Sequence, residues 1–312
     1  MAWLAHSIEH LSRHLADANH RRQRLDECDL SPLNRIVQYT PEDMTVTVQA
    51  GRTLASLQRE LAAHRQWLPV DPPHPEQVTL ADLVQRNLHG PHRFGYGTLR
   101  DHLIGLRVAL PDGRIVRSGG QVVKNVAGYD LPKLFVGSQG TLGLVVEATF
   151  KLMPLPHAEQ FHARSAPDPM AAAPLIRSIL DSHISPVVLD LCPAPEHGCR
   201  VVVGISGSTE QVQWQQDQCE RLGFTEPADL SHESAFWNPA LTDSVHQWSL
   251  PPTRLAESVA SLPTRHWVAR AGNGLLLYRG HRPPPPATLP HRLMQRVKST
   301  FDPHGILPDV PW

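Results

Sequence analysis

The sequence predicts an α+β protein with two domains. Its 312 residues are more than one small core usually organises, so about two domains are expected. Short β-branched runs and amphipathic helical runs follow each other without a repeat of fixed period, which disfavours a solenoid or a propeller. The composition changes after Pro156, because residues 157–174 are rich in Ala, Pro and His. We therefore expect a first domain at 1–156, a linker at 157–174 and a second, smaller domain at 175–312.

The first domain is expected to begin with an amphipathic helix. Apolar residues recur at helical spacing from Ser7, which suits an N-cap, to Arg24. Farther along, the Asp112-Gly113 turn lies between two apolar runs and predicts a hairpin. The remaining elements expected here are hairpin strands at 103–110 and 115–118, strands at 33–37, 45–50 and 144–150, and helices at 53–64 and 79–87.

The second domain also mixes helices and strands. Helical patterns at 173–182 and 208–222 enclose two strand patterns at 187–191 and 200–206. The other elements expected in this half are strands at 266–270 and 274–278 and a final helix at 289–300.

One stretch, residues 119–156, organises the first domain. Within it lies the turn Gly137-Ser138-Gln139-Gly140-Thr141-Leu142-Gly143, which is followed by a β-branched strand. Its glycines allow positive φ and close approach of the backbone to another group. Such a turn is either a cradle for a pyrophosphate or a tight turn with no ligand, and its spacing alone leaves both open.

Composition excludes several classes of function. The net charge of −1 gives no electrostatic basis for binding nucleic acid. The four cysteines contain no CxxC pair, which disfavours an iron–sulfur or zinc site and suits a reducing compartment. No apolar run is long enough for a transmembrane segment, and no signal peptide follows the first residues. We expect a cytoplasmic protein without a metal site.

Several motifs together resemble one known family. Leu68-Pro69-Val70-Asp71-Pro72-Pro73, Tyr96-Gly97-Thr98-Leu99-Arg100-Asp101 and the sequence VVKNVAGYDLPKLFVGSQGTLG at 122–143 are similar to FAD-binding oxidases of the vanillyl-alcohol-oxidase (PCMH) type. Within that superfamily they resemble the FAD-binding E-type subunit of glycolate oxidase. The similarity covers about residues 7–156 and continues more weakly at 270–274 and 301–307. It implies a PCMH-type FAD-binding domain of two subdomains at 1–156 and a ferredoxin-like α+β cap at 175–312.

The resemblance also implies the residues that contact FAD. Pro72 and Thr79 would border the flavin, and Val146 would offer backbone contacts near the adenine. Residues expected to line the dinucleotide are Tyr96, Gly97, Thr98, Asp101 and Ile104. Residues expected to pack the domain core against the cofactor are Gly137, Ser138, Gly140, Thr141 and Gly143. An alternative is that Tyr96, Thr98 and Asp101 only close a turn.

Two departures from the family concern the same ligand. Family members carry a strand and a glycine-rich loop around the FAD pyrophosphate before the segment Leu33-Asn34-Arg35, whereas here the first helix runs almost directly into Asp26-Glu27-Cys28. The family also has Gly-Gly where this chain has Ala81-Asp82. A carboxylate beside a pyrophosphate is electrostatically unfavourable, and both side chains add bulk. The sequence therefore leaves the FAD occupancy open.

These features of the sequence leave three hypotheses for the function of the chain. The first is a FAD-dependent oxidoreductase subunit that oxidises a small 2-hydroxy acid. It would pass electrons to a quinone or to a partner subunit such as an iron–sulfur chain, and these partners could hold it at the periphery of the inner membrane. The second is a cofactor-poor family member with a structural or regulatory role in an oxidase complex. The third is that the strand and loop are missing only from the recorded gene sequence. No catalytic residue follows from the sequence: His266 and Arg270 are candidates for the base and the carboxylate-binding cation, but surface or satisfied side chains are the simpler interpretation.

Overall fold

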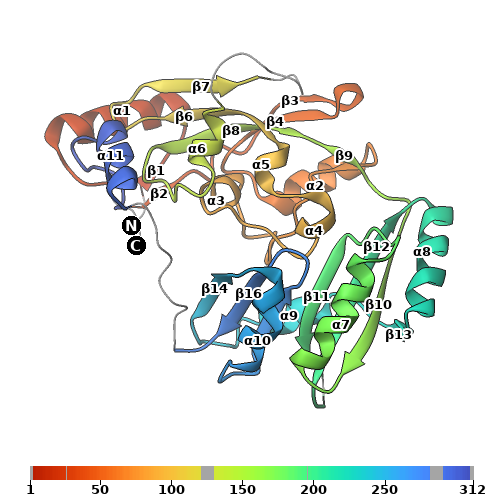
Figure 1. Cartoon of the computed structure of the whole chain (residues 1–312). Coiled ribbons are helices and arrows are strands. Elements are labelled where there is room, and N and C mark those ends of the chain that lie inside the picture. Colours follow the sequence, from red (N-terminus) through yellow and green to blue (C-terminus); the bar gives the residue numbers. More distant parts are fainter. Residues whose placement is uncertain (1–2, 26, 121–129, 195, 282–290, 310–312) are drawn as a thin grey trace. The chain divides into compact units, whose positions relative to one another are not determined.

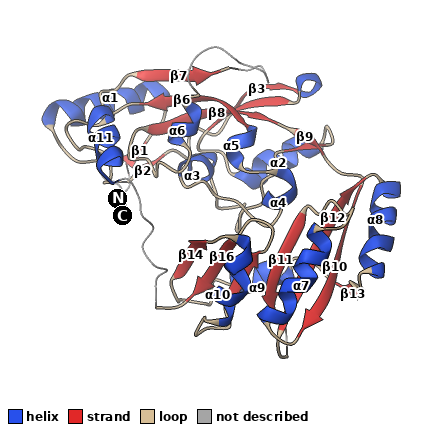
Figure 2. Ribbon diagram, in the orientation of Figure 1, coloured by secondary structure: helices blue, strands red, loops and turns tan. Residues whose placement is uncertain are grey.

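The computed structural model describes residues 3–25, 27–120, 130–194, 196–281 and 291–309. These residues form two compact units (Figure 1). Unit 1 comprises residues 1–89, 98–155 and 288–312, and unit 2 comprises residues 90–97 and 156–287. Both units combine helices with antiparallel sheets, so the predicted α+β class is confirmed (Figure 2).

Unit 1 begins with a short parallel pair of strands joined through a helix. Strand β1 (Trp3–Leu4) leads into α1 (Ile8–Arg21), and β2 (Cys28–Asp29) returns to pair in parallel with β1. Helix α1 forms where the apolar spacing predicts it, because Ile8, Leu11, Leu15 and Ala18 are buried on one face. The N-cap prediction is also confirmed, since the Ser7 side chain accepts a hydrogen bond from the His10 N–H.

A five-stranded antiparallel sheet forms the centre of unit 1. Its order is β3-β4-β8-β6-β7. The strands are β3 (Ile36–Thr40), β4 (Thr45–Gln49), β6 (Leu103–Ala109), β7 (Ile115–Gly119) and β8 (Leu144–Lys151). The predicted hairpin is β6–β7, whose turn contains Gly113 at φ +85°.

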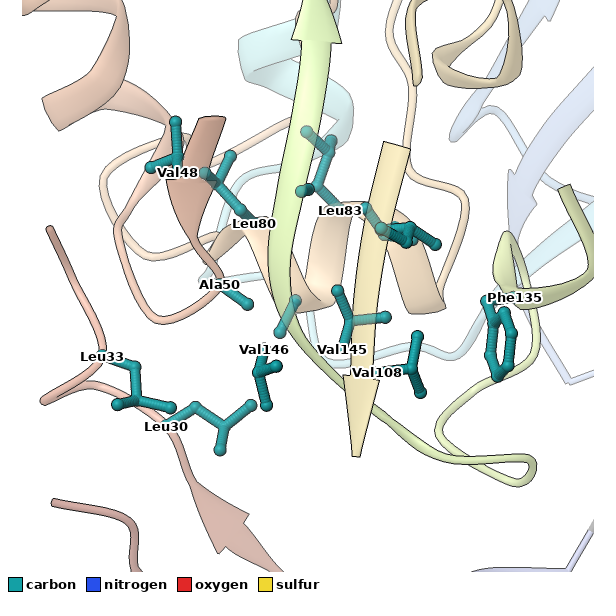
Figure 3. Packing of buried hydrophobic residues seen from close by; sticks show 14 of the residues in the cluster. Leu30, Leu33, Val48, Ala50, Leu80, Leu83, Val108, Phe135, Val145 and Val146 are labelled. Carbon is teal, nitrogen blue, oxygen red and sulfur yellow. The ribbon is translucent and has the colours of Figure 1, made fainter. Parts of the chain in front are cut away.

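Short helices pack their apolar side chains into the core of unit 1. The elements are α2 (Leu54–Ala62), α3 (Leu80–Gln85), α5 (Leu99–His102), α6 (Pro132–Phe135), α11 (His291–Phe301), a 3₁₀ turn at Pro41–Asp43, and the small pair β5 (Gln66–Trp67) and β9 (Met153–Pro154). Figure 3 shows Leu80 and Leu83 of α3 in one cluster with Val48 of β4 and Val145 of β8. Helix α3 is therefore anchored by its buried face, and the positions of its two ends are fixed by this packing.

Unit 2 contains a ferredoxin-like motif, as the family resemblance implies. The elements β10 (Ala158–Ala166), α7 (Pro169–Leu180), β11 (Val188–Pro193), β12 (Cys199–Gly207), α8 (Thr209–Arg221) and β13 (Glu226–Pro227) follow each other in βαββαβ order. Their spatial order is β13-β10-β12-β11. Both helices contribute to one apolar cluster with the sheet, so they cover the same face (Figure 2).

Three further strands widen this sheet beyond β11. The order continues β15-β16-β14, which makes seven strands. These strands and the accompanying helices are β14 (Val245–Ser249), β15 (Trp267–Arg270), β16 (Leu275–Arg279), α4 (Arg93–Tyr96), α9 (Ser231–Phe236), α10 (Leu255–Ala260) and a 3₁₀ turn at Pro252–Arg254.

The domain limits differ from those expected. Residues 157–174 are not a linker, because they contain β10 and the start of α7, and β10 pairs with β12 along nine residues. The segment lacks a clear period because the two buried residues of β10, Ala163 and Ala166, are three positions apart and enter different apolar clusters, one on each face of the strand. The C-terminal residues 291–309 belong with unit 1, where Ile306 and Leu307 enter the core.

Candidate functional site

The residues expected to contact a cofactor are divided between the two units. Tyr96 and Gly97 belong to unit 2, while the others belong to unit 1. Within unit 1, Thr79 begins α3, and the turn from Gly137 to Gly143 lies against the end of the same helix. Helix α3 is thus the element that brings two of the expected contact regions together.

A capping box closes the start of α3. The Thr79 hydroxyl accepts a hydrogen bond from the Asp82 N–H at 3.1 Å, and the Asp82 carboxylate accepts one from the Thr79 N–H at 3.2 Å. The Thr79 hydroxyl also donates to Asp82 Oδ2 at 2.6 Å. The signal for this arrangement is present in the sequence, because a Thr followed three residues later by an acidic residue is the signature of a capping box. The comparison with the family motif indicates only that Asp82 replaces a glycine and does not reveal this local role.

The other N–H groups at the start of α3 bond to carbonyls of the residues that directly follow β4. Leu80 N–H donates to the carbonyl of Arg52 at 2.9 Å, and Ala81 N–H donates to the carbonyl of Ala50 at 2.8 Å. The four N–H groups that a helix leaves unpaired at its start are therefore all bonded within the chain. This end of α3 has no N–H group left for a phosphate and carries a carboxylate, so it does not fit the pyrophosphate of FAD.

The glycine-rich turn closes the other end of α3. Gly137 N–H donates to the carbonyl of Val84 at 3.0 Å, and Gln139 N–H donates to that of Gln85 at 2.7 Å. Gly137 and Gly140 have φ values of +79° and +74°, which only glycine adopts without strain. These N–H groups complete a helix end, so they do not form the pyrophosphate cradle considered from the sequence.

A largely buried lysine, whose side chain is 12% exposed, supports this turn from the C-terminal segment. The Lys298 ammonium donates to the carbonyl of Thr141 at 3.0 Å and to the Asp302 carboxylate at 2.5 Å. Asp302 is buried and also accepts hydrogen bonds from the N–H groups of Ile306 and Leu307. The C-terminal helix and its exit turn therefore help to hold the glycine-rich turn in place.

A second capping box begins α5, at two of the expected contact residues. Asp101 accepts hydrogen bonds from the Thr98 N–H at 2.8 Å and from the Thr98 hydroxyl at 2.9 Å. The bond from the Thr98 N–H is the main cause that lowers the pKa of Asp101. The alternative that these two residues close a turn agrees with this geometry.

Tyr96 lies in unit 2 and contacts strand β12. Its hydroxyl lies 2.5 Å from the Ser206 hydroxyl. Burial raises the pKa of Tyr96, against the effect of the bond to Ser206. Gly97, at φ +86°, ends α4 beside it.

The remaining expected contact residues have structural partners of their own. Val146 is fully buried, and its carbonyl accepts the Ala50 N–H at 2.9 Å. A Cβ on Gly143 would lie 2.7 Å from Val108 Cγ1, so this glycine is required by packing against β6. The Thr141 hydroxyl donates to the Ser138 carbonyl at 2.7 Å. Pro72 is buried in a loop, and Ile104 is half-buried in β6.

The strand and loop that family members place after the first helix have no counterpart among the described residues of this region. Helix α1 ends at Arg21 and β2 begins at Cys28. Residues 22–25 and 27 contain no strand, and the single residue between them lies outside the described part. The departure seen in the sequence is therefore present in the fold as well.

The residues weighed for catalysis are engaged in other interactions. Arg270 is buried, and its guanidinium donates to Asp190 at 2.5 Å and to Glu233 at 2.6 and 2.8 Å. His232 Nε2 lies 3.0 Å from the same Asp190 oxygen. His266 is exposed. This network was not predicted from the sequence, although an Asp inside the apolar strand pattern 187–191 is a signal that a buried partner is required.

This network does not form a cation site. Asp190, His232 and Glu233 bring ligand atoms within 4.8 Å of one another. The Arg270 guanidinium, however, already lies between the two carboxylates. The positive charge at this position is thus supplied by the chain itself.

Among the helices of the described chain, none combines the length and the apolar character that crossing a membrane requires.

Comparison with known proteins identifies the fold. A family model described as a FAD binding domain matches residues 28–119. Glycolate oxidase subunit GlcE of Escherichia coli is 29% identical over 297 residues, which cover 87% of this chain and 82% of that protein. Glycolate oxidase subunit GlcD of Bacillus subtilis is 37% identical over 163 residues, which cover 52% of this chain. The chain spans only about a third of the length of GlcD, 35%.

A solved structure extends the comparison to the whole fold. Alkyldihydroxyacetonephosphate synthase superposes with a TM-score of 0.71 over 97% of this chain and 74% of that chain, at 16% identity. At this identity the likeness concerns the fold alone. The family model and the glycolate oxidase subunits support the resemblance to FAD-binding oxidases of the PCMH type that the sequence motifs indicate.

Proposed function

We propose that the chain is a subunit of a FAD-dependent oxidoreductase complex that oxidises a small 2-hydroxy acid such as glycolate. The observation that carries this proposal is the similarity to a glycolate oxidase subunit along 87% of the chain, which includes both units. D-lactate dehydrogenases also match, for example that of Saccharomyces cerevisiae at 32% identity over 187 residues. Glycolate and D-lactate share the 2-hydroxy acid group, so the matches favour one class of substrate.

The chain's own residues favour a supporting place in this complex. Oxidation of a 2-hydroxy acid needs a base for the hydroxyl proton and a cation for the carboxylate. Arg270, the cation weighed for that role, is held by Asp190 and Glu233 inside unit 2. We therefore assign substrate binding to a partner subunit, with electrons passing to that partner, to an iron–sulfur chain or to a quinone. An association with the inner membrane would then depend on the partners.

The family match supports FAD as the cofactor of this fold. The closed start of α3 means that a flavin in this chain depends on other contact residues. Tyr96, Gly97, Thr98, Asp101, Ile104, Pro72 and Val146 remain the proposed contacts. The closed helix end also favours the second candidate, a cofactor-poor subunit with a structural or regulatory role in the same complex.

The test is isolation of the complex through a tag on the full chain. We expect a second FAD-fold subunit to copurify and the complex to reduce a dye acceptor when glycolate or D-lactate is added. A complex assembled without this chain should lose that activity. Failure of any oxidase subunit to copurify, or full activity without this chain, would exclude the proposal.

A visible spectrum of the purified chain separates the two candidates. Flavin absorbance near 450 nm, retained or regained after addition of FAD, supports a flavin-bearing subunit. A colourless chain that takes up no FAD, yet is required for activity of the complex, supports the cofactor-poor subunit.

A further inference from the structure

The start of α3 contains an anion that belongs to the chain. The N-terminal end of a helix favours negative charge, because its unpaired N–H groups point outward. Here the Asp82 carboxylate supplies that charge from within the first turn and bonds to the Thr79 N–H and hydroxyl. An external phosphate at this position would compete with a carboxylate that is already attached.

The surroundings of Asp82 leave little freedom for rearrangement. The Leu80 and Ala81 N–H groups bond to the carbonyls of Arg52 and Ala50, which flank Gly51. A Cβ added to Gly51 would lie 1.8 Å from the Leu30 carbonyl oxygen, so the backbone of Leu30 is in close contact with this corner. The segment that follows β2 therefore packs directly against the residues that hold the start of α3.

We infer that Asp82 acts as an internal substitute for the pyrophosphate and excludes that group from the start of α3. The inference rests on the family fold and is independent of the reaction proposed above. It makes Asp82 a residue that determines cofactor specificity: any flavin bound by this chain is recognised without a contribution from its pyrophosphate at this helix.

Comparison of FAD with riboflavin tests the inference directly, because riboflavin has no phosphate. Both ligands are titrated into the purified full chain, and the quenching of flavin fluorescence gives each dissociation constant. The wild-type chain gives the reference preference for FAD, to which contacts with the adenosine part of FAD also contribute. A preference for FAD that stays at the wild-type value in both variants described below would overturn the inference.

Two variants are designed to remove the negative charge of Asp82 from the start of α3. The double variant Ala81→Gly, Asp82→Gly removes the carboxylate and restores the family's glycine pair. We expect it to raise the preference for FAD over riboflavin at least about tenfold above the wild-type value. The single variant Asp82→Asn keeps a capping oxygen and removes only the charge, so a smaller gain in the preference for FAD, about two- to threefold over wild type, is expected.

A matched control distinguishes the general effect of losing a charged helix cap from the specific effect of removing the Asp82 carboxylate from the start of α3. Asp168 caps α7 in unit 2, where its carboxylate accepts the Ala171 N–H at 2.8 Å. Asp168→Asn should leave the ratio of the two dissociation constants unchanged. A folded double variant without any gain in FAD preference would contradict the assigned role of Asp82. If the double variant fails to fold, the wild-type ratio and the Asp82→Asn ratio decide the matter.

Discussion

The two ends of α3 are closed in different ways. At the first end, the side chains of Thr79 and Asp82 bond to the helix backbone. At the second end, the N–H groups of Gly137 and Gln139 bond to the last carbonyls. One closure therefore depends on side-chain identity, and the other depends on a backbone path that positive φ at glycine makes possible.

This difference explains why one part of the family signature is informative about fold and another about ligand. A turn that caps a helix through its backbone is needed whether or not a cofactor is bound, so its glycines are required by the fold. A helix start closed by a side chain can gain or lose an anion site through one or two substitutions. Ala81 and Asp82 are therefore more informative about FAD than the glycine-rich turn.

The largest expected effect concerns Lys298, which supports the glycine-rich turn at the second end of α3. Lys298→Met leaves the buried Asp302 carboxylate without its cation and the Thr141 carbonyl without a donor. Because Asp302 keeps two backbone hydrogen bonds, we expect the free energy of unfolding to fall by about 3 kcal/mol, the lower limit for breaking a buried ion pair. Urea unfolding of the full chain at pH 7 measures the change.

An exposed lysine provides the control for this prediction. Lys133 pairs with Asp130 at 2.8 Å, and both side chains are about half exposed, at 43% and 52%. Lys133→Met should change the free energy of unfolding by less than about 0.5 kcal/mol. Equal effects of the two substitutions would mean that Lys298 does not support the turn.

A smaller effect is expected at the first end. Asp82→Ala removes the acceptor of the Thr79 N–H, while the Asp82 N–H keeps its bond to the Thr79 hydroxyl. The loss of this part of the capping box should cost about 1 kcal/mol in the free energy of unfolding. Glu76→Ala, at an exposed pair with Arg59, is the control and should change little. No loss of stability in Asp82→Ala would show that the box contributes nothing to the closure.

Much of the fold could be predicted because its signals are local. The period of Ile8, Leu11 and Leu15 marked α1, and the Asp112-Gly113 pair marked the β6–β7 hairpin. The strand β10 was missed, since it consists largely of polar residues and Ala and becomes a strand only by pairing with β12. The return of residues 291–309 to unit 1 was missed for a related reason: the contacts that hold it are distant in sequence.

The candidate site was less accessible to prediction than the fold. Spacing indicated that Gly137 and Gly140 need unusual backbone angles, but not whether their neighbours bind a ligand or a helix end. Likewise, the sequence contains Asp190 and Arg270 far apart, and their pairing depends on the neighbouring positions of β11 and β15. Site assignments require the partner of each polar group, and that partner is set by tertiary structure.

The smallest effect tests the second capping box, at the exposed start of α5. The folded-state pKa of Asp101 is lowered, chiefly by the bond from the Thr98 N–H. A lowered carboxyl pKa contributes stability that is fully present above the unfolded value of about 3.9 and is lost as the pH falls through the folded value. Asp101→Asn should therefore reduce stability at pH 7 by less than about 1 kcal/mol, and the difference from wild type should shrink as the pH is lowered below about 4. Urea unfolding at a series of pH values measures this, and a difference that stays constant across the series would show that the charge of Asp101 is not what stabilises the start of α5.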